Sequence, residues 1–270
     1  MEPTPRDRAG LDSVPAKIES RWTAIQGARI HSRSCTAATP RTPPIVLVHG
    51  LGVSSRYMVP TARLLAHELP VHAVDLPGFG LSSKPERVLG VRELAHALVG
   101  WLAETGLERP VVVANSFGCQ VVAELAVARP GLVDRLVLLA PTVDPAARST
   151  GWHALRWLLT VPWERPALQR VIARDYRDAG LARVRATAQL ALDDRIEAKL
   201  PQIGAPVLVV RGSRDRVVPQ RWAQEAATLA PDGRLTVIPG APHCLNFSAA
   251  EEVAALVGAF VGRASPPRAP

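Results

Sequence analysis

The stretch VVVANSFGCQVVAEL, residues 111–125, changes character at a single serine. A run of valines precedes Ser116, and the residues after it return to the spacing of an apolar helix. Ala114 and Gly118 stand two residues to either side. Small residues at these positions indicate a tight strand-to-helix turn that points the serine hydroxyl outward at the helix N-terminus. An ordinary serine N-cap gives the same local pattern, so this stretch alone leaves both interpretations open.

Short β-branched runs recur along the chain, and each is closed by turn residues. They cover residues 44–50, 71–80, 110–116, 134–141, 206–215 and 234–243. Their near-continuous apolar character is typical of strands covered on both faces, and therefore of a parallel sheet. Helical patterns lie between them at 55–69, 91–105, 117–129, 219–230 and 248–263. The alternation predicts an open α/β sheet, whose functional sites lie at the carboxyl ends of the strands.

One connection is much longer than the others. Residues 142–205 separate two predicted strands, whereas a crossover needs only about a dozen residues. The segment contains Trp152, Trp157 and Trp163 and reads as a helical cap over the strand ends. The predicted organisation is a disordered leader at 1–16, a core at 17–141, the cap insertion at 142–205, the second part of the core at 206–263 and a tail at 264–270.

Composition limits the possible partners. The net charge is +8, but 29 of the 32 basic residues are arginines that are scattered among acids, which argues against nucleic acid. No apolar run reaches the roughly 18–20 residues of a membrane span, and the polar N-terminus lacks signal-peptide character. Cys35, Cys119 and Cys244 form no metal-ligand spacing and fit a reducing cytoplasm. We therefore predict a cytoplasmic protein without metal, nucleic-acid or membrane partners, and its oligomeric state stays open.

A nucleophilic serine needs a base, and the base needs an acid that fixes its tautomer. Asp215 and His243 each follow a predicted strand and precede a helix, as Ser116 does. Three loops at the same sheet edge therefore predict a catalytic triad of Ser116, His243 and Asp215. Asp144, after another strand, is a rival for the acid. The backbone N–H of Phe117, at the start of the helix, is a predicted oxyanion donor.

Several motifs together resemble the α/β-hydrolase superfamily, in its cap-bearing branch, over roughly residues 17–263. They are VLVHGLG, DLPGFGLSS, NSFG, PVLVVRGSRDRVVP and PGAPHCLNFSAAEEV. The resemblance implies an α/β-hydrolase fold with a mostly parallel sheet and a second oxyanion donor at the backbone N–H of Leu51. It implies no organic cofactor and no metal. His49 and Asp75 are interpreted as structural residues that orient their loops.

The predicted reaction is hydrolysis of a small carboxylic ester, lactone or thioester through an acyl-enzyme. An alternative is carbon–carbon hydrolysis, because NSFG with Asn115 resembles the elbow of meta-cleavage-product hydrolases. Those relatives usually have tryptophan after the catalytic histidine, where this chain has Cys244. Arg148 or Arg174 could then meet a substrate carboxylate. A non-catalytic ligand-binding role is a third hypothesis. The candidate pocket residues are Gly50, Asn115, Trp152, Trp157 and Cys244.

Overall fold

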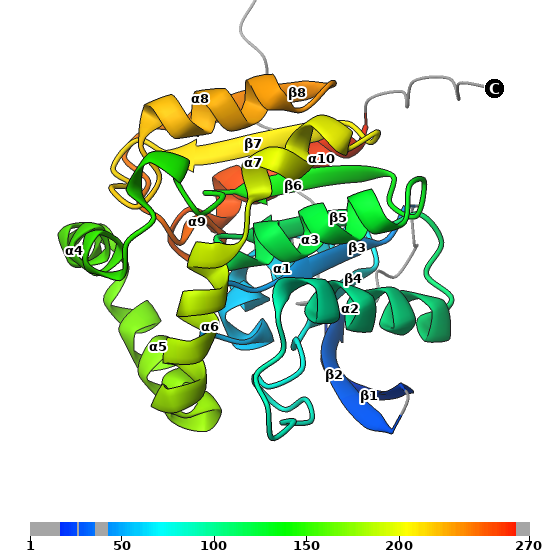
Figure 1. The fold of residues 1–270 in the computed structure, drawn as a ribbon. Coiled ribbons are helices and arrows are strands. Elements are labelled where there is room, and N and C mark those ends of the chain that lie inside the picture. Colours follow the sequence, from blue (N-terminus) through cyan, green and yellow to red (C-terminus); the bar gives the residue numbers. More distant parts are fainter. Residues whose placement is uncertain (1–16, 26, 36–42, 263–270) are drawn as a thin grey trace, which may run out of the picture.

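The computed structural model describes residues 17–25, 27–35 and 43–262. The predicted leader at 1–16 and the tail at 264–270 lie outside these residues. Within the described chain, strands form one sheet in the order β1-β2-β4-β3-β5-β6-β7-β8 (Figure 1). Neighbouring strands from β4 through β3 to β8 run parallel, and β1 and β2 pair antiparallel at one edge.

The parallel strands correspond to the apolar runs of the sequence. They are β3 (Ile45–Val48), β4 (Val71–Val74), β5 (Val111–Asn115), β6 (Arg135–Leu139), β7 (Val207–Gly212) and β8 (Gly233–Ile238). The residues of β3, β5, β6 and β7 are buried throughout, as expected for strands covered on both faces. The edge hairpin of β1 (Ile18–Ile25) and β2 (Ala28–Cys35) was not among the predicted strands.

Helices cover both faces of the sheet (Figure 1). On one face, α1 (Val59–Leu65) packs against α10 (Ala250–Val261). On the other, α3 (Phe117–Ala128) packs between α2 (Val91–Thr105) and α7 (Ile196–Lys199), while α8 (Gln220–Leu229) contacts β7 and β8. The predicted helix at 55–69 is divided, since a 3-10 turn, Ser55–Met58, precedes α1. The predicted helix at 248–263 corresponds to α10, and a separate short helix, α9 (Leu245–Ser248), comes before it.

The long connection between β6 and β7 is helical, as predicted. Its main helices are α4 (Thr150–Thr160), α5 (Pro166–Ala179) and α6 (Leu181–Asp193), with 3-10 turns at Pro145–Ala147, Val161–Trp163 and Leu200–Gln202. Figure 1 shows α4, α5 and α6 beside the ends of the central strands. These helices are cap-like, and the exact division into core and cap stays a prediction.

Polar contacts fasten α5 to the loop that follows β3. Asp175 is buried and accepts a hydrogen bond from Ser54 Oγ at 2.8 Å, and it also pairs with Arg56. The ring of Tyr176 lies so close to Gly52 that a Cβ there would be 2.6 Å from Cε1. Gly52 also has a φ of +74°, a left-handed conformation that favours glycine. The cap-like helices thus hold this loop directly.

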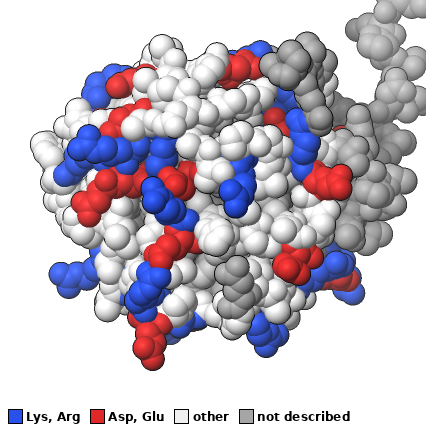
Figure 2. All heavy atoms as spheres, turned by 45° about the vertical axis from the view of Figure 1, so that its right-hand side comes forward, with Lys and Arg blue, Asp and Glu red and all other residues white. Residues whose placement is uncertain are grey.

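In the part of the chain that the structure describes, no helix is both long and apolar enough to cross a membrane. On the face shown in Figure 2, basic and acidic side chains are interspersed, and no continuous basic patch appears there. Among the described residues, Arg87 forms an ion pair with Glu93, and Arg109 forms one with Asp134 at 3.0 Å.

Candidate active site

The turn between β5 and α3 has the geometry that the sequence indicated. Ser116 has φ 55° and ψ −121°, a strained conformation for a residue with a side chain. A Cβ added at Gly118 would lie 2.6 Å from the carbonyl oxygen of His49. The start of α3 therefore approaches the backbone after β3 very closely. The Ser116 side chain makes no capping hydrogen bond to α3, so the ordinary N-cap does not account for this serine.

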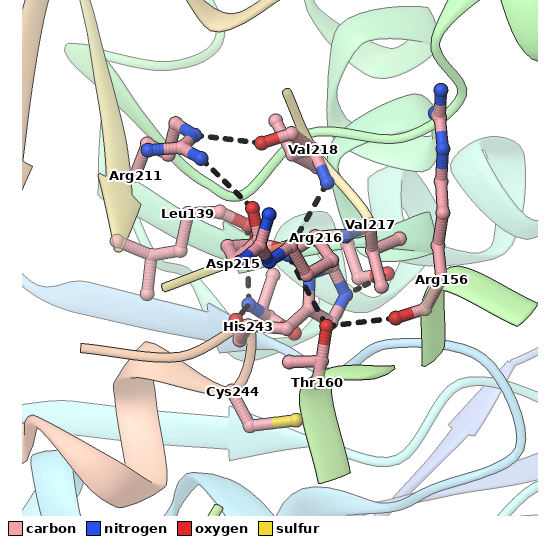
Figure 3. A network of polar contacts seen from close by, with 12 residues as sticks. Leu139, Arg156, Thr160, Arg211, Asp215, Arg216, Val217, Val218, His243 and Cys244 are labelled. Carbon is pink, nitrogen blue, oxygen red and sulfur yellow. Dashed lines mark hydrogen bonds and ion pairs between the residues drawn. The ribbon is translucent and has the colours of Figure 1, made fainter. Parts of the chain in front are cut away.

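The structure brings Ser116, His243 and Asp215 into one hydrogen-bonded line. The distance from Ser116 Oγ to His243 Nε2 is 3.0 Å, and that from His243 Nδ1 to Asp215 Oδ2 is 2.9 Å. Asp215 accepts at Oδ2, so Nδ1–H donates and Nε2 is free to accept from the serine hydroxyl. Figure 3 shows the imidazole of His243 pointing at the Asp215 carboxylate.

Backbone contacts hold the loops of the acid and the base together. A Cβ at Gly212, the last residue of β7, would lie 2.2 Å from the carbonyl oxygen of Ala241, so glycine permits the close approach. The other oxygen of Asp215, Oδ1, accepts from the N–H groups of Val217 and Val218 at 2.8 and 3.0 Å. Asp215 is thus fully buried with partners on both oxygens, which fixes the direction of its carboxylate.

The surroundings of His243 favour its protonated form. Burial by itself lowers the pKa of this imidazole, but the charge and hydrogen bond of Asp215, together with the charge of Glu164, outweigh burial and raise it. A raised pKa makes the imidazole a stronger base when it takes the serine proton. The Trp157 ring stands edge-on to His243 with centroids 5.9 Å apart and shields it from solvent.

Two residues beside Ser116 have backbone amides without a described hydrogen-bond partner. Those of Leu51 and Phe117 donate to no other group in the described residues, and both residues line the cavity. Phe117 begins α3, where an amide has no partner within the helix. Leu51 and Phe117 therefore both lie beside Ser116, and their role as oxyanion donors stays a prediction.

His49 holds the loop that carries Leu51. Its Nδ1–H donates to Gly50 O at 2.8 Å, while Nε2 accepts from the amide of Leu76 at 3.0 Å. Burial lowers the pKa of His49, which keeps the ring neutral in this tautomer. His49 thus joins the loops after β3 and β4, in line with the structural role expected from the sequence.

Asp75 also connects these loops, through several hydrogen bonds to its carboxylate. Its carboxylate accepts from His31 Nδ1 and the Leu81 amide at 2.8 Å, and from the Ser55 amide at 2.6 Å. Burial tends to raise the pKa of Asp75, but these bonds and the nearby His49 lower it to about 2. The Asp75 carboxylate therefore accepts hydrogen bonds within these loops and has no described contact with Ser116.

Asp144 is placed in other contacts. It pairs with Arg156 at 2.9 Å and with Arg221, and it caps a 3-10 turn by accepting from the amide of Ala146. Burial tends to raise the pKa of Asp144, and the two arginines lower it. All its described contacts are with residues other than His243, so the geometry favours Asp215 as the partner of the base.

A cavity of about 320 Å³ opens at Ser116 and His243. Its walls are largely apolar and come from both the strand ends and the cap-like helices. Lining residues include Gly50, Leu51, Val53, Phe117, Val143, Ala154, Trp157, Ile172, Val184, Leu192, Val217 and Cys244. Trp157 therefore lies where the sequence analysis expected. Trp152 does not: it is 55% exposed and packs against Arg156 instead, because it lies on the opposite side of α4.

Asn115 lines the cavity, but its side chain is engaged within the fold. The amide nitrogen donates to the carbonyl oxygens of Leu139 at 3.1 Å and His243 at 3.2 Å, and Tyr57 donates its hydroxyl to the amide oxygen. Asn115 thus positions the backbone of the histidine loop. Cys119 is buried behind the elbow, where its thiol contacts Ala114 O at 3.4 Å.

Glu164 was not identified from the sequence. It follows α4 and its 3-10 turn, it is buried, and its carboxylate accepts from the Cys244 amide at 2.8 Å and from Ser248 Oγ at 2.6 Å. A cap residue thus holds the segment directly after His243. The sequence signal was a lone acid between Trp163 and Arg165, which resembles any exposed charge.

The structure places a different arginine at the cavity from those considered in the sequence. Arg148 donates to the carbonyls of Leu192 and Asp194 and to Glu197, and the Arg174 side chain is 62% exposed beside Asp178. Among the described lining residues, Arg185 on α6 is the permanently charged one. Arg185 is an exposed residue and has no ion pair within the described chain. The sequence spacing did not indicate that Arg185 lines the cavity.

The described residues contain no group of three or more His, Cys, Asp or Glu side chains that could hold a metal ion. The chemistry of this arrangement is that of an activated hydroxyl beside two free amides, which suits attack on a carbonyl carbon.

A model of the alpha/beta hydrolase family matches residues 45–256. The chain belongs to the alpha/beta hydrolase family. Among its hydrolase relatives, the pimeloyl-acyl-carrier-protein methyl ester esterase of Stenotrophomonas maltophilia is 27% identical over 267 residues, which cover 84% of this chain and 96% of that protein.

Solved structures share the fold of this alpha/beta hydrolase. The enol-lactonase of Burkholderia xenovorans has a TM-score of 0.77 at 20% identity and covers 90% of this chain and 100% of its own. A 2-hydroxy-6-oxo-6-phenylhexa-2,4-dienoate hydrolase from a Rhodococcus species has a TM-score of 0.77 at 20% identity, covering 92% and 100%. At this level of identity the likeness establishes the fold alone. The structural neighbours of the chain include meta-cleavage-product hydrolases.

Proposed function

We propose that this hydrolase cleaves a small carboxylic ester through an acyl-enzyme, with Ser116 as nucleophile, His243 as general base and Asp215 as the orienting acid. The observation that carries the proposal is the pair of hydrogen bonds of 3.0 and 2.9 Å that joins these three side chains beside a cavity. The esterase relative supports the substrate class, and a largely apolar cavity suits an uncharged acyl chain.

The reaction proceeds in two halves. His243 Nε2 takes the hydroxyl proton as Ser116 Oγ attacks the carbonyl carbon, and the N–H groups of Leu51 and Phe117 bind the oxyanion. The tetrahedral intermediate collapses, His243 passes its proton to the leaving alkoxide, and an alcohol departs. Water, deprotonated by His243, then attacks the acyl-enzyme and releases the acid and the free serine. Lactones and thioesters would react by the same steps.

Labelling with a fluorophosphonate probe tests the nucleophile. The native chain should label at Ser116, and Ser116→Ala should abolish both labelling and turnover of p-nitrophenyl esters while leaving the melting temperature nearly unchanged. A folded native chain that does not label would instead favour the non-catalytic, ligand-binding role.

A second candidate is carbon–carbon hydrolysis of a dienoate, as in the Rhodococcus structure. The observation that favours it is Arg185, since a guanidinium at an apolar cavity fits a substrate that carries a carboxylate. Assays with p-nitrophenyl esters of increasing chain length, beside a dienoate, separate the two. Turnover of the dienoate alone would replace the ester proposal.

A further inference from the structure

The helix α4 presents different residues on two opposite sides. One side lines the cavity through Thr150, His153, Ala154 and Trp157, which follow the spacing of one helix face. The other side carries large apolar residues that face outward: Trp152, Leu155, Leu158 and Leu159, which are 55%, 45%, 66% and 54% exposed. Trp163 follows in the next turn at 48%. These residues, 152, 155, 158, 159 and 163, are called the outer face of α4 below.

The outer face is a local concentration, since five of the nine large apolar side chains that are exposed in the described chain belong to it. Figure 1 shows α4 at the outer edge of the molecule, with the remaining elements to one side of it. Grouped apolar side chains on a protein surface mark a contact site, whereas isolated ones need no explanation.

Arginines gather at the C-terminal end of this face. Arg214 stacks on Trp163, with its guanidinium carbon 4.0 Å from the ring centroid. The backbone of Arg216 donates to Thr160 Oγ1 at 3.2 Å, and Arg165 follows Trp163 by two residues. All three arginines are exposed, and none forms an ion pair with another described residue. The basic groups are therefore available to an external anion.

We propose that the outer face of α4, with Arg165, Arg214 and Arg216, docks on the surface of an anionic lipid bilayer. Tryptophan and leucine on one side of a helix, beside free arginines, is the combination that binds the interface of anionic membranes. This proposal departs from the sequence-based prediction of no membrane partner. That prediction depended on the absence of an apolar run long enough to span a bilayer, and a helix that lies on the surface needs no such run.

A second copy of the chain is the less favourable occupant. In a two-fold dimer the arginines at the end of α4 would meet either their own copies or the first turn of the other copy's α4, which contains no acid to neutralise them. An anionic surface instead complements that charge. The inference concerns binding alone, and it holds whether or not Ser116 acts as proposed.

Vesicle co-sedimentation of the full chain tests the proposal. Vesicles of phosphatidylcholine mixed with phosphatidylglycerol should retain the chain at least about tenfold more strongly than phosphatidylcholine alone, and added salt should weaken retention. The double variant Leu155→Ser/Leu159→Ser should bind the mixed vesicles at least about tenfold more weakly. Trp22→Ser is the matched control, because Trp22 is 47% exposed on β1, and its binding should match that of the native chain.

The triple variant Arg165→Gln/Arg214→Gln/Arg216→Gln tests the contribution of the arginines. This variant should lose affinity for the mixed vesicles and most of the salt dependence. Sedimentation velocity of the native chain provides the other decisive measurement. Absence of binding to mixed vesicles overturns the proposal. So does a concentration-dependent dimer that Leu155→Ser/Leu159→Ser dissociates, since the face would then join two copies.

Discussion

The close approach of α3 to the backbone after β3 can be tested at one glycine. A Cβ at Gly118 would lie 2.6 Å from His49 O and 2.9 Å from Val48 O. Both obstacles are backbone atoms, so no side chain can rotate away. In Gly118→Ala, either α3 or the loop after β3 must therefore move by about half an ångström, which is the scale of an overpacked core.

The expected magnitude follows from two opposing effects. Overpacking costs about 1–3 kcal/mol, and the better helix propensity of alanine recovers up to about 1 kcal/mol. We expect a net loss of about 1–2 kcal/mol in the free energy of unfolding. Activity should suffer more, because the Phe117 amide and Ser116 move together with α3. A displacement of this size corresponds to a loss of about 10–100-fold in kcat.

Urea denaturation and p-nitrophenyl ester turnover measure the two effects. Gly258→Ala in α10 is the control, since its new Cβ would meet nothing within 4 Å. It should stabilise the chain by about 0.5–1 kcal/mol and leave kcat unchanged. If Gly118→Ala kept both its stability and its activity within twofold of the native chain, the argument that a tight elbow sets the site geometry would be wrong.

The remaining predictions concern the acid, the base and the cap. Asp215→Asn should lower turnover by about three to four orders of magnitude, measured with the same esters, while Asp144→Asn should have a far smaller effect. Because the pKa of His243 is raised above the ordinary 6.5, kcat/KM should fall as pH drops through that raised value and the imidazole takes a proton. The same shift stabilises the fold below the ordinary pKa, and that gain is lost as pH rises through the raised value. Glu164→Gln keeps an acceptor for the Cys244 amide but removes a negative charge, so the acidic limb of the profile should move to lower pH; an unmoved limb would limit Glu164 to a structural role.

The sequence predicted the parallel part of the sheet because each central strand is apolar along its length. The edge hairpin was missed for the complementary reason. In β1 the residues are half-buried or exposed, and polar side chains such as Glu19 and Arg21 break any continuous run. Pairing with β2, and not composition, defines that strand. β2 is mostly buried but was missed as well, because its sequence, ARIHSRSC, is largely polar. Local patterns thus reveal apolar strands better than polar ones.

The candidate site also contains residues that the sequence predicted and residues that it missed. Ser116, Asp215 and His243 stand at strand ends, and strand ends meet at one edge of any parallel sheet. Their proximity could therefore be predicted without coordinates. The assignment of Trp152 to the pocket failed because the rotation of α4 about its axis depends on tertiary contacts, and α4 carries tryptophans on both its cavity side and its outer side. Glu164 was missed because its hydrogen-bond partner is far away in the sequence, and Arg185 was missed because the cavity that it lines exists only in the folded chain.

The attachment of α5 and Glu164 to the loops around Ser116 matters for anyone who remodels this enzyme. Randomising the segment between β6 and β7 to admit bulkier molecules would also remove two hydrogen bonds: the one that Asp175 accepts from Ser54 and the one that Glu164 accepts from the Cys244 amide. Libraries that leave these two acids untouched should yield more active clones than fully randomised ones. In evolution, too, new specificities should arise first at positions such as Ile172 and Ala188, which line the cavity.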